Sequence, residues 1–149
     1  IGVPAEHVTT IDHDMELPTK VLKPEREFKG QKFVHNKADK STWSDFRIPG
    51  FKCRDTTIAE NTKNVAGVQV VRPNGSAIKP SKHDCDILFN FVMEGKMTLT
   101  ASGQPSNALT SGDAFVIPPD LLTEYSNLSK DLELLEVSLP GKFKTYYDA

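Results

Sequence analysis

Short β-rich runs alternate with turn dipeptides through most of this 149-residue chain, and that alternation restricts the folds open to it. From Lys32 onward, pairs such as Pro49-Gly50, Asn74-Gly75 and Glu94-Gly95 separate runs rich in β-branched and aromatic residues. This pattern is typical of an all-β sandwich or barrel. The predicted strands are Lys32–His35, Thr42–Arg47, Phe51–Asp55, Gly67–Arg72, Ala77–Pro80, Ile87–Met93, Lys96–Ala101, Ser106–Leu109, Ala114–Ile117, Thr123–Asn127 and Leu132–Ser138.

The two ends of the chain differ from this β-rich body, which we place at residues 41–139. Residues 1–40 are polar and interrupted by prolines, so we predict an extended N-terminal arm there. Residues 140–149 form a C-terminal tail that begins with Pro140-Gly141. We expect the aromatic residues of the tail to pack on the outside of the body, with a partner contact as the alternative. The prolines and aromatic residues concerned are Pro4, Pro18, Pro24, Phe143, Tyr146 and Tyr147.

Composition argues against several classes of protein. The 18 basic and 20 acidic residues leave a net charge of -2, whereas nucleic-acid binders usually show a basic excess. No apolar run approaches the roughly 18–20 residues that a membrane span needs. Cys53 and Cys85 are too few for a disulfide framework, and we expect both to be free buried thiols. These features predict a cytoplasmic protein that binds neither nucleic acid nor membrane.

Two spaced motifs carry the most specific information. In the first, five residues separate Gly75 from Ser81-Lys82-His83, four more precede Leu88, and six more precede Gly95. The second begins with Gly112, which five residues separate from Pro118. Asp120, Thr123 and Asn127 complete this second motif.

Together the two motifs resemble those of the cupin superfamily. At these spacings the family's first motif has Gly, His-x-His, Glu and Gly, and its second has Gly, Pro-x-Gly, His and Asn. The resemblance covers about two-thirds of the chain, from Thr42 to Leu139. It implies an all-β, cupin-type double-stranded β-helix, which is a jelly-roll barrel. The framework positions that match are Gly75, Gly95, Gly112, Pro118 and Asn127.

The family's metal-binding positions match poorly. In cupins, the two histidines and the glutamate of the first motif and the histidine of the second bind a divalent metal such as Fe, Mn, Ni or Zn. Here these positions are Ser81, His83, Leu88 and Thr123. One imidazole is too few for a stable transition-metal site, which normally takes three or four protein ligands. We therefore predict no metal cofactor.

An alternative metal site uses His83 with Cys85 and Asp86, which follow it closely. The family bends its chain just after the second histidine, so the resemblance implies that Cys85 leaves the pocket. The remaining histidines, His7, His13 and His35, precede the body, and we expect them on the surface or in loops. A metal-free His83 could still bond a ligand or transfer protons.

Strand alternation predicts which side chains face the barrel interior. If Leu88 points inward, Phe89, Phe91 and Met93 point to the opposite side, where they form a second layer or a subunit interface. The predicted pocket is an apolar cup with a few polar groups, as in many small-molecule sites. Its lining residues are Ser81, His83, Leu88, Asn90, Val92, Thr123 and Tyr125. The alternative is a filled core in which Ser81, Asn90 and Thr123 satisfy one another.

These observations favour a metal-free cupin domain that binds a small molecule as a sensing, accessory or regulatory module. Because the sequence begins at Ile1, we expect a cut end, so this chain could be the C-terminal domain of a longer protein. One alternative is a metal-dependent isomerase, lyase or dioxygenase with a non-standard ligand set. Another is a dimerisation module with a filled barrel. The resemblance also implies a homodimer.

Overall fold

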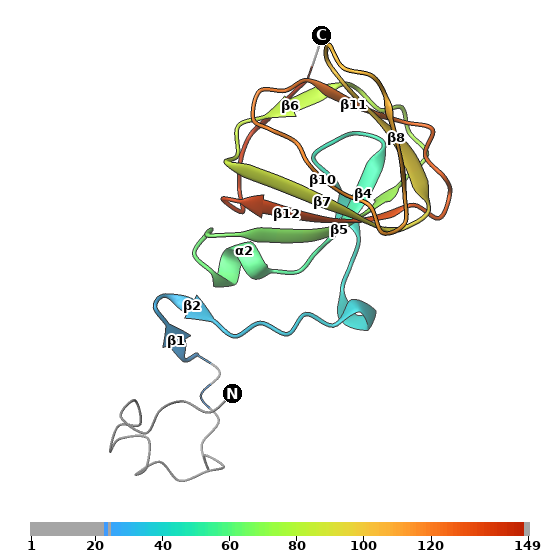
Figure 1. The fold of residues 1–149 in the computed structure, drawn as a ribbon. Coiled ribbons are helices and arrows are strands. Elements are labelled where there is room, and N and C mark those ends of the chain that lie inside the picture. Colours follow the sequence, from blue (N-terminus) through green and yellow to red (C-terminus); the bar gives the residue numbers. More distant parts are fainter. Residues whose placement is uncertain (1–22, 24, 148–149) are drawn as a thin grey trace, which may run out of the picture.

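A computed structural model of the protein describes Lys23 and residues 25–147. Predictions that concern Pro4, Pro18, Pro24, His7 and His13 fall outside this part of the chain. Two antiparallel sheets form the body of the molecule (Figure 1). Within the described residues, no helix has the length and apolarity needed to cross a bilayer.

The larger sheet has six strands in the order β10-β7-β12-β5-β4-β3, and the smaller has five in the order β13-β6-β11-β8-β9. The strand bounds in the larger sheet are β3 (Ser44–Asp45), β4 (Phe51–Asp55), β5 (Gly67–Pro73), β7 (Ile87–Glu94), β10 (Ala114–Val116) and β12 (Glu133–Leu139). Those in the smaller sheet are β6 (Ser81–His83), β8 (Lys96–Ala101), β9 (Asn107–Thr110), β11 (Thr123–Ser126) and β13 (Thr145–Tyr147).

The elements outside these sheets are short. In the arm, β1 (Glu27–Phe28) and β2 (Gln31–Lys32) form a hairpin, which the 3-10 turn η2 (Ala38–Lys40) follows. The helix α2 (Ile58–Asn61) lies between β4 and β5. Figure 1 shows the arm running below α2 and β5, and an ion pair of 3.4 Å between Lys63 Nζ and Glu27 Oε2 connects it to the body.

The central strand β7 shows why the sequence folds into a layered barrel. Leu88, Asn90 and Val92 are buried, whereas the residues between them are half-buried on the opposite face. Side chains of a strand alternate between the two faces of a sheet, so one face of β7 lines the core. This division into an inner and an outer face is the one that the sequence predicts, and the structure confirms it.

Three predicted strands differ clearly from those observed. The predicted strand Thr42–Arg47 is reduced to β3, Ser44–Asp45, and the chain leaves the ladder at Phe46. No strand forms over Ala77–Pro80, and the ladder begins at Ser81 instead. Proline has no backbone N–H to donate to a ladder, so Pro80 is a poor strand residue. The predicted run Lys32–His35 is likewise mostly irregular, because β2 ends at Lys32.

The tail contributes a strand that the sequence pattern does not predict. β13 pairs antiparallel with β6, with Thr145 opposite His83 and Tyr147 opposite Ser81. The segment is only three residues long, and Pro140-Gly141 precedes it closely, so no alternation is visible in the sequence. The tail therefore lies beside the first motif of the barrel. The division of the chain into 1–40, 41–139 and 140–149 stays a prediction.

Candidate functional site

The side chains predicted to line a pocket come from β6, β7 and β11, and the structure buries all of them. They are Ser81, His83, Leu88, Asn90, Val92, Thr123 and Tyr125, each with at most 4% of its surface exposed. β6 and β11 meet where Thr123 pairs with Ser81. Whether these side chains bind a ligand stays a prediction.

His83 uses both of its ring nitrogens within the chain. Its Nε2 atom lies 3.0 Å from the carbonyl oxygen of Ile117, and its Nδ1 atom lies 3.0 Å from Sγ of Cys85. A carbonyl oxygen accepts hydrogen bonds only, so Nε2 carries the proton, and Nδ1 accepts from the thiol. Burial lowers the pKa of His83, and the nearby Arg47 guanidinium lowers it further against the opposing effect of the Ile117 bond. The imidazole is therefore neutral at physiological pH.

The prediction that Cys85 leaves the pocket is wrong. Its side chain is 0% exposed, and besides facing His83 it lies 3.4 Å from the carbonyl oxygen of Ile87. The chain does leave β6 after His83, but it turns so that Cys85 still points inward. Burial raises the pKa of this thiol to about 11, so it stays protonated. Asp86, the third member of the alternative metal site, is exposed.

The donors at the family's metal positions do not fit a transition metal. Leu88 has no lone pair, and hydroxyl groups occupy two of the other positions. One of these, Oγ1 of Thr123, already donates to the carbonyl oxygen of Ser81 at 3.3 Å. The lone pair on Nδ1 of His83 is used by Cys85. Among the described residues, no three His, Cys, Asp or Glu side chains converge as metal ligands.

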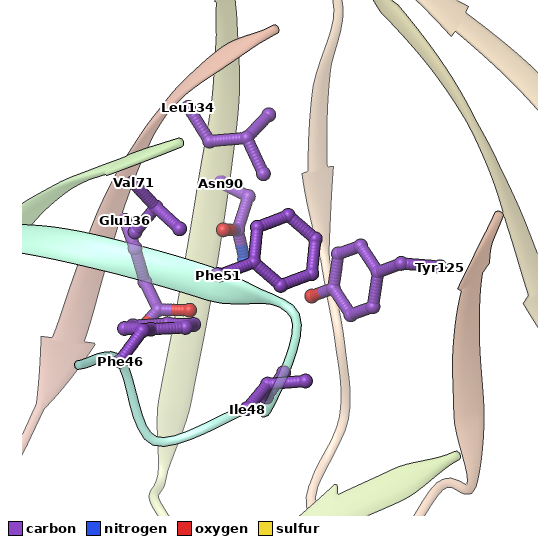
Figure 2. Close-up of a pocket in the computed structure, with 8 residues that line it drawn as sticks. All are labelled: Phe46, Ile48, Phe51, Val71, Asn90, Tyr125, Leu134 and Glu136. Atoms are coloured by element: carbon purple, nitrogen blue, oxygen red, sulfur yellow. The ribbon is translucent and has the colours of Figure 1, made fainter. Parts of the chain in front are cut away.

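The barrel encloses a cavity of about 10 Å³, enough for one water molecule. Its wall combines aromatic and aliphatic groups with three polar side chains. It is lined by Phe46, Ile48, Phe51, Val71, Asn90, Tyr125, Leu134 and Glu136 (Figure 2). Figure 2 shows the Tyr125 hydroxyl, the Asn90 amide and the Glu136 carboxylate directed toward the centre of this group.

Asn90 carries an unsatisfied group in this cavity. Its Nδ2 atom is fully buried and has no hydrogen-bond partner within the described part of the chain. Leaving a buried donor unpaired costs about 1–3 kcal/mol. An unpaired donor of this kind in a native structure points to a water or a ligand that completes it.

One side of the cavity is closed by residues 46–50, which we call the plug, through the side chains of Phe46 and Ile48. The plug joins β3 to β4, and its Ile48 is 2% exposed. Figure 2 shows the side chains of Phe46 and Ile48 pointing from this segment into the cavity. The plug keeps the cavity small, because its side chains occupy the volume that a ligand would need.

An ion pair joins the plug to the barrel wall. The Arg47 guanidinium donates to Glu136 through Nη2 at 2.6 Å and through Nε at 3.3 Å. The side chain of Glu136 is 5% exposed and that of Arg47 is 18% exposed. Burial opposes the charge on Arg47, but attraction to Glu136 outweighs it, and the pKa of Arg47 is raised. Burial also raises the pKa of Tyr125, which the neighbouring Arg47 partly counteracts.

The C-terminal tail holds the plug in place. The Arg47 guanidinium lies 5.0 Å from the ring centroid of Phe143, and its Nη1 atom donates to Oγ1 of Thr145 at 3.4 Å. The hydroxyl of Tyr147 donates to the backbone oxygen of Arg47. Phe143 also meets the His83 ring edge-on, with the ring centroids 5.9 Å apart. The predicted packing of this tail on the outside of the body is therefore incomplete, because Phe143 is partly buried against the hydrophobic core.

Sequence reasoning missed the plug and Glu136. Alternation along β12 gives one signal that could have found Glu136, because it lies between Leu134 and Ser138 on the inward face. A charged residue at an inward position needs a partner. Nothing in the sequence identifies that partner as Arg47, which is 89 residues away in the chain.

A larger hollow lies outside the barrel. It is an open groove of about 550 Å³ beside Asp84, Pro140 and Lys144. Its best-placed acidic group is already used, because Asp84 accepts from the Lys144 backbone N–H at 2.8 Å and from the Tyr146 hydroxyl at 3.2 Å. The enclosed chamber, with its unpaired donor, is therefore the stronger candidate site.

Known proteins resemble this chain in structure and not detectably in sequence. No protein-family model matches the sequence, and no curated protein matches it. KdgF from Halomonas sp. is 19% identical with a TM-score of 0.60, over 72% of this chain and 94% of that one. The polyketide cyclase RemF from Streptomyces resistomycificus is 18% identical with a TM-score of 0.61, over 80% and 86%. A cupin-like protein from Thermotoga maritima is 18% identical with a TM-score of 0.55, over 72% and 84%.

These likenesses identify the fold. The chain is an all-β protein with the cupin barrel fold, and the resemblance seen in the two motifs is confirmed at that level. RemF is a polyketide cyclase, and at 18% identity its likeness to this chain concerns the fold alone.

Proposed function

We propose that this chain is a metal-independent cupin domain that binds a small molecule inside the barrel. The observation that carries the proposal is the Nδ2 atom of Asn90, a buried donor with no partner within the described residues. It faces a chamber that also presents the Tyr125 hydroxyl and the Glu136 carboxylate. A few convergent polar groups in an apolar chamber are the usual construction of a small-molecule site.

Binding requires the plug to move, because the present cavity holds one water. The backbone of the plug is held on one side by the short pairing of β3 with β4 at Ser44 and Asp45 and by a hydrogen bond of 3.3 Å from the Phe46 N–H to the Phe51 carbonyl oxygen. It is held at its other end by Gly50, whose backbone oxygen accepts from Asn74 at 2.9 Å. A hinge at Gly50 would let Phe46 and Ile48 leave the cavity while the barrel strands stay in place.

A second candidate is a filled barrel that acts as an assembly module. The small cavity supports it, as does the apolar outer face of the six-stranded sheet. On that face, Phe89 and Phe91 are half-buried, and Val116 is 57% exposed. The homodimer stays a prediction, to be checked by sedimentation equilibrium.

The metal-dependent alternative has less support. A bound metal would need the lone pair on His83 Nδ1, which accepts from Cys85, and further ligands from positions that hold hydroxyls and an alkyl group. Metal analysis of the purified protein tests this point. A stoichiometric transition metal that disappears in His83→Ala would overturn the metal-independent proposal.

The ligand-binding proposal is tested by screening small polar compounds with NMR. We expect at least one compound to shift the resonances of Asn90 and Tyr125. Asn90→Leu should weaken the binding of that compound about fivefold, since a hydrogen bond contributes about 1 kcal/mol. Asn107→Leu is the matched control, because Asn107 is exposed on β9 and should leave binding unchanged. If no compound enters the barrel and the protein is a dimer, the assembly module replaces this proposal.

A further inference from the structure

The charge of the barrel interior is balanced by a residue that does not belong to the barrel wall. Glu136 lies on β12 in the middle of the larger sheet, with 5% of its side chain exposed. A carboxylate buried to this degree needs a cation or several hydrogen bonds. Its cation is Arg47, and the plug supplies it. The wall therefore presents a negative site that the plug fills.

Aromatic rings complete this site as one suited to an organic cation. The Arg47 guanidinium lies 4.9 Å from the ring centroid of Phe46, which moves with the plug, and 5.0 Å from that of Phe143, which belongs to the tail and stays behind. Ring faces attract cations, and the attraction is stronger where water is excluded. Phe51 and Tyr125 line the same cavity as Glu136, and their rings meet edge-to-face with centroids 5.7 Å apart. A carboxylate surrounded by rings selects a cation with apolar surface over a hydrated metal ion.

We infer that the ligand of this barrel is a small organic cation, a guanidinium or alkylammonium compound, which takes the place of the Arg47 side chain at Glu136. This inference rests on the proposed function and names the class of its ligand. Arg47 occupies the site as an internal substitute, and the ligand binds when the plug withdraws.

Two features of the cavity narrow the chemical class of the ligand further. A neutral or anionic ligand would leave Glu136 buried without a cation once Arg47 had moved, and that is strongly unfavourable. The unpaired Nδ2 atom of Asn90 is a donor, so it calls for an acceptor on the ligand. The best ligand therefore combines a cationic group with a nearby hydroxyl or carbonyl oxygen.

The chain contains a surface counterpart that provides a control. Arg72 pairs with Glu133 at 2.5 Å and lies 4.6 Å from the ring centroid of Trp43. This second Arg–Glu pair with an aromatic ring is half-exposed, with 49% of the Arg72 side chain accessible. Removing Arg72 leaves a solvated carboxylate, which has no need of a replacement cation.

The experiment removes the Arg47 side chain and adds a small organic cation that could replace it. Arg47→Ala, Arg72→Ala and Arg47→Ala combined with Glu136→Gln are each titrated with ethylguanidinium, propanamide and propionate at constant ionic strength. We expect ethylguanidinium to raise the Tm of Arg47→Ala saturably, by about 2–4 °C, because a ligand that binds the folded state stabilises it. Arg72→Ala and the double variant should show no rise. Wild type should bind at least tenfold more weakly, because Arg47 competes.

The outcomes separate this inference from the proposed function. If propanamide or propionate binds inside Arg47→Ala and ethylguanidinium does not, barrel binding stands and the cation inference is overturned. If no probe binds any variant or the wild type, the cation inference is overturned, and the NMR screen of polar compounds decides the proposed function separately. If Arg47→Ala is unfolded alone, recovery of its near-UV circular dichroism with ethylguanidinium supports the inference, and absence of recovery overturns it.

Discussion

The Nδ1 atom of His83 lies 3.0 Å from Sγ of Cys85, and this contact decides what the remaining motif histidine can do. With Nε2 donating to the carbonyl oxygen of Ile117, neither ring nitrogen is free to bind a metal or abstract a proton. The histidine is part of a closed hydrogen-bonded pair inside the barrel. Both ring nitrogens are used within the chain, one by Ile117 and one by Cys85.

Buried, neutral His83 should make the protein less stable in acid. Burial lowers its pKa in the folded state below the unfolded value of about 6.5. As the pH falls below about 6.5, the unfolded chain binds a proton that the folded state refuses. The free energy of unfolding should therefore fall by up to about 1.4 kcal/mol per pH unit until the pH reaches the folded-state pKa. Urea denaturation between roughly pH 7 and pH 5 measures this fall in the free energy of unfolding.

His83→Gln should flatten this pH dependence, although it lowers stability at every pH. His35→Gln is the matched control, because His35 is exposed, and it should keep the slope of the wild type. Equal slopes in the wild type and His83→Gln would show that His83 is not the group that titrates.

Both thiols should be protected in the folded protein. Burial raises the pKa of Cys85 to about 11 and also raises the pKa of Cys53, and the two side chains are 0% and 4% exposed. Only the thiolate reacts readily with disulfide reagents. Ellman's reagent should therefore modify neither cysteine until guanidinium chloride unfolds the chain. Ser102→Cys, which adds a thiol at an exposed position, should react at once in the folded state and is the positive control. Rapid labelling of the native wild type would contradict the prediction.

The framework of the fold was predictable because it depends on local conditions. Gly95 and Gly112 adopt φ values of +79° and +96°, which glycine tolerates better than other residues, so their spacing reports the turns directly. Alternation along β7 reports which side chains face inward, because a strand has only two faces. Both signals can be seen within a few residues of sequence.

The charged part of the site was not predictable, because it depends on contacts between distant segments. Arg47 and Glu136 are 89 residues apart, and the alternation that places Glu136 inward says nothing of its partner. Cys85 was predicted to leave the pocket from the course of the family's chain, yet it turns back onto His83. Its orientation follows from its burial against the His83 ring and the Ile87 carbonyl oxygen, contacts that the spacing of the motif does not encode.

The two motif glycines should differ in how much an alanine costs. At Gly112 an added Cβ meets nothing within 4 Å, so Gly112→Ala should lose only about 1–2 kcal/mol for its left-handed backbone. At Gly95 the same atom would lie 2.7 Å from Cα and 2.8 Å from the backbone nitrogen of Leu132. Backbone cannot yield easily, so Gly95→Ala should cost about 1–3 kcal/mol more. Urea denaturation of both variants measures the difference, and equal losses would contradict the close approach of Gly95 to Leu132.

Two arginines that make similar contacts should differ widely in their contribution to stability. Arg47→Ala removes the cation from Glu136, whose side chain is only 5% exposed in the intact pair, so it should lower the free energy of unfolding by about 3–5 kcal/mol. Arg72→Ala leaves Glu133 with 21% exposure at the surface, and should cost about 1 kcal/mol or less. Urea denaturation at neutral pH measures both. Similar losses would mean that water reaches Glu136 when the arginine is removed, and the plug would then not seal the barrel.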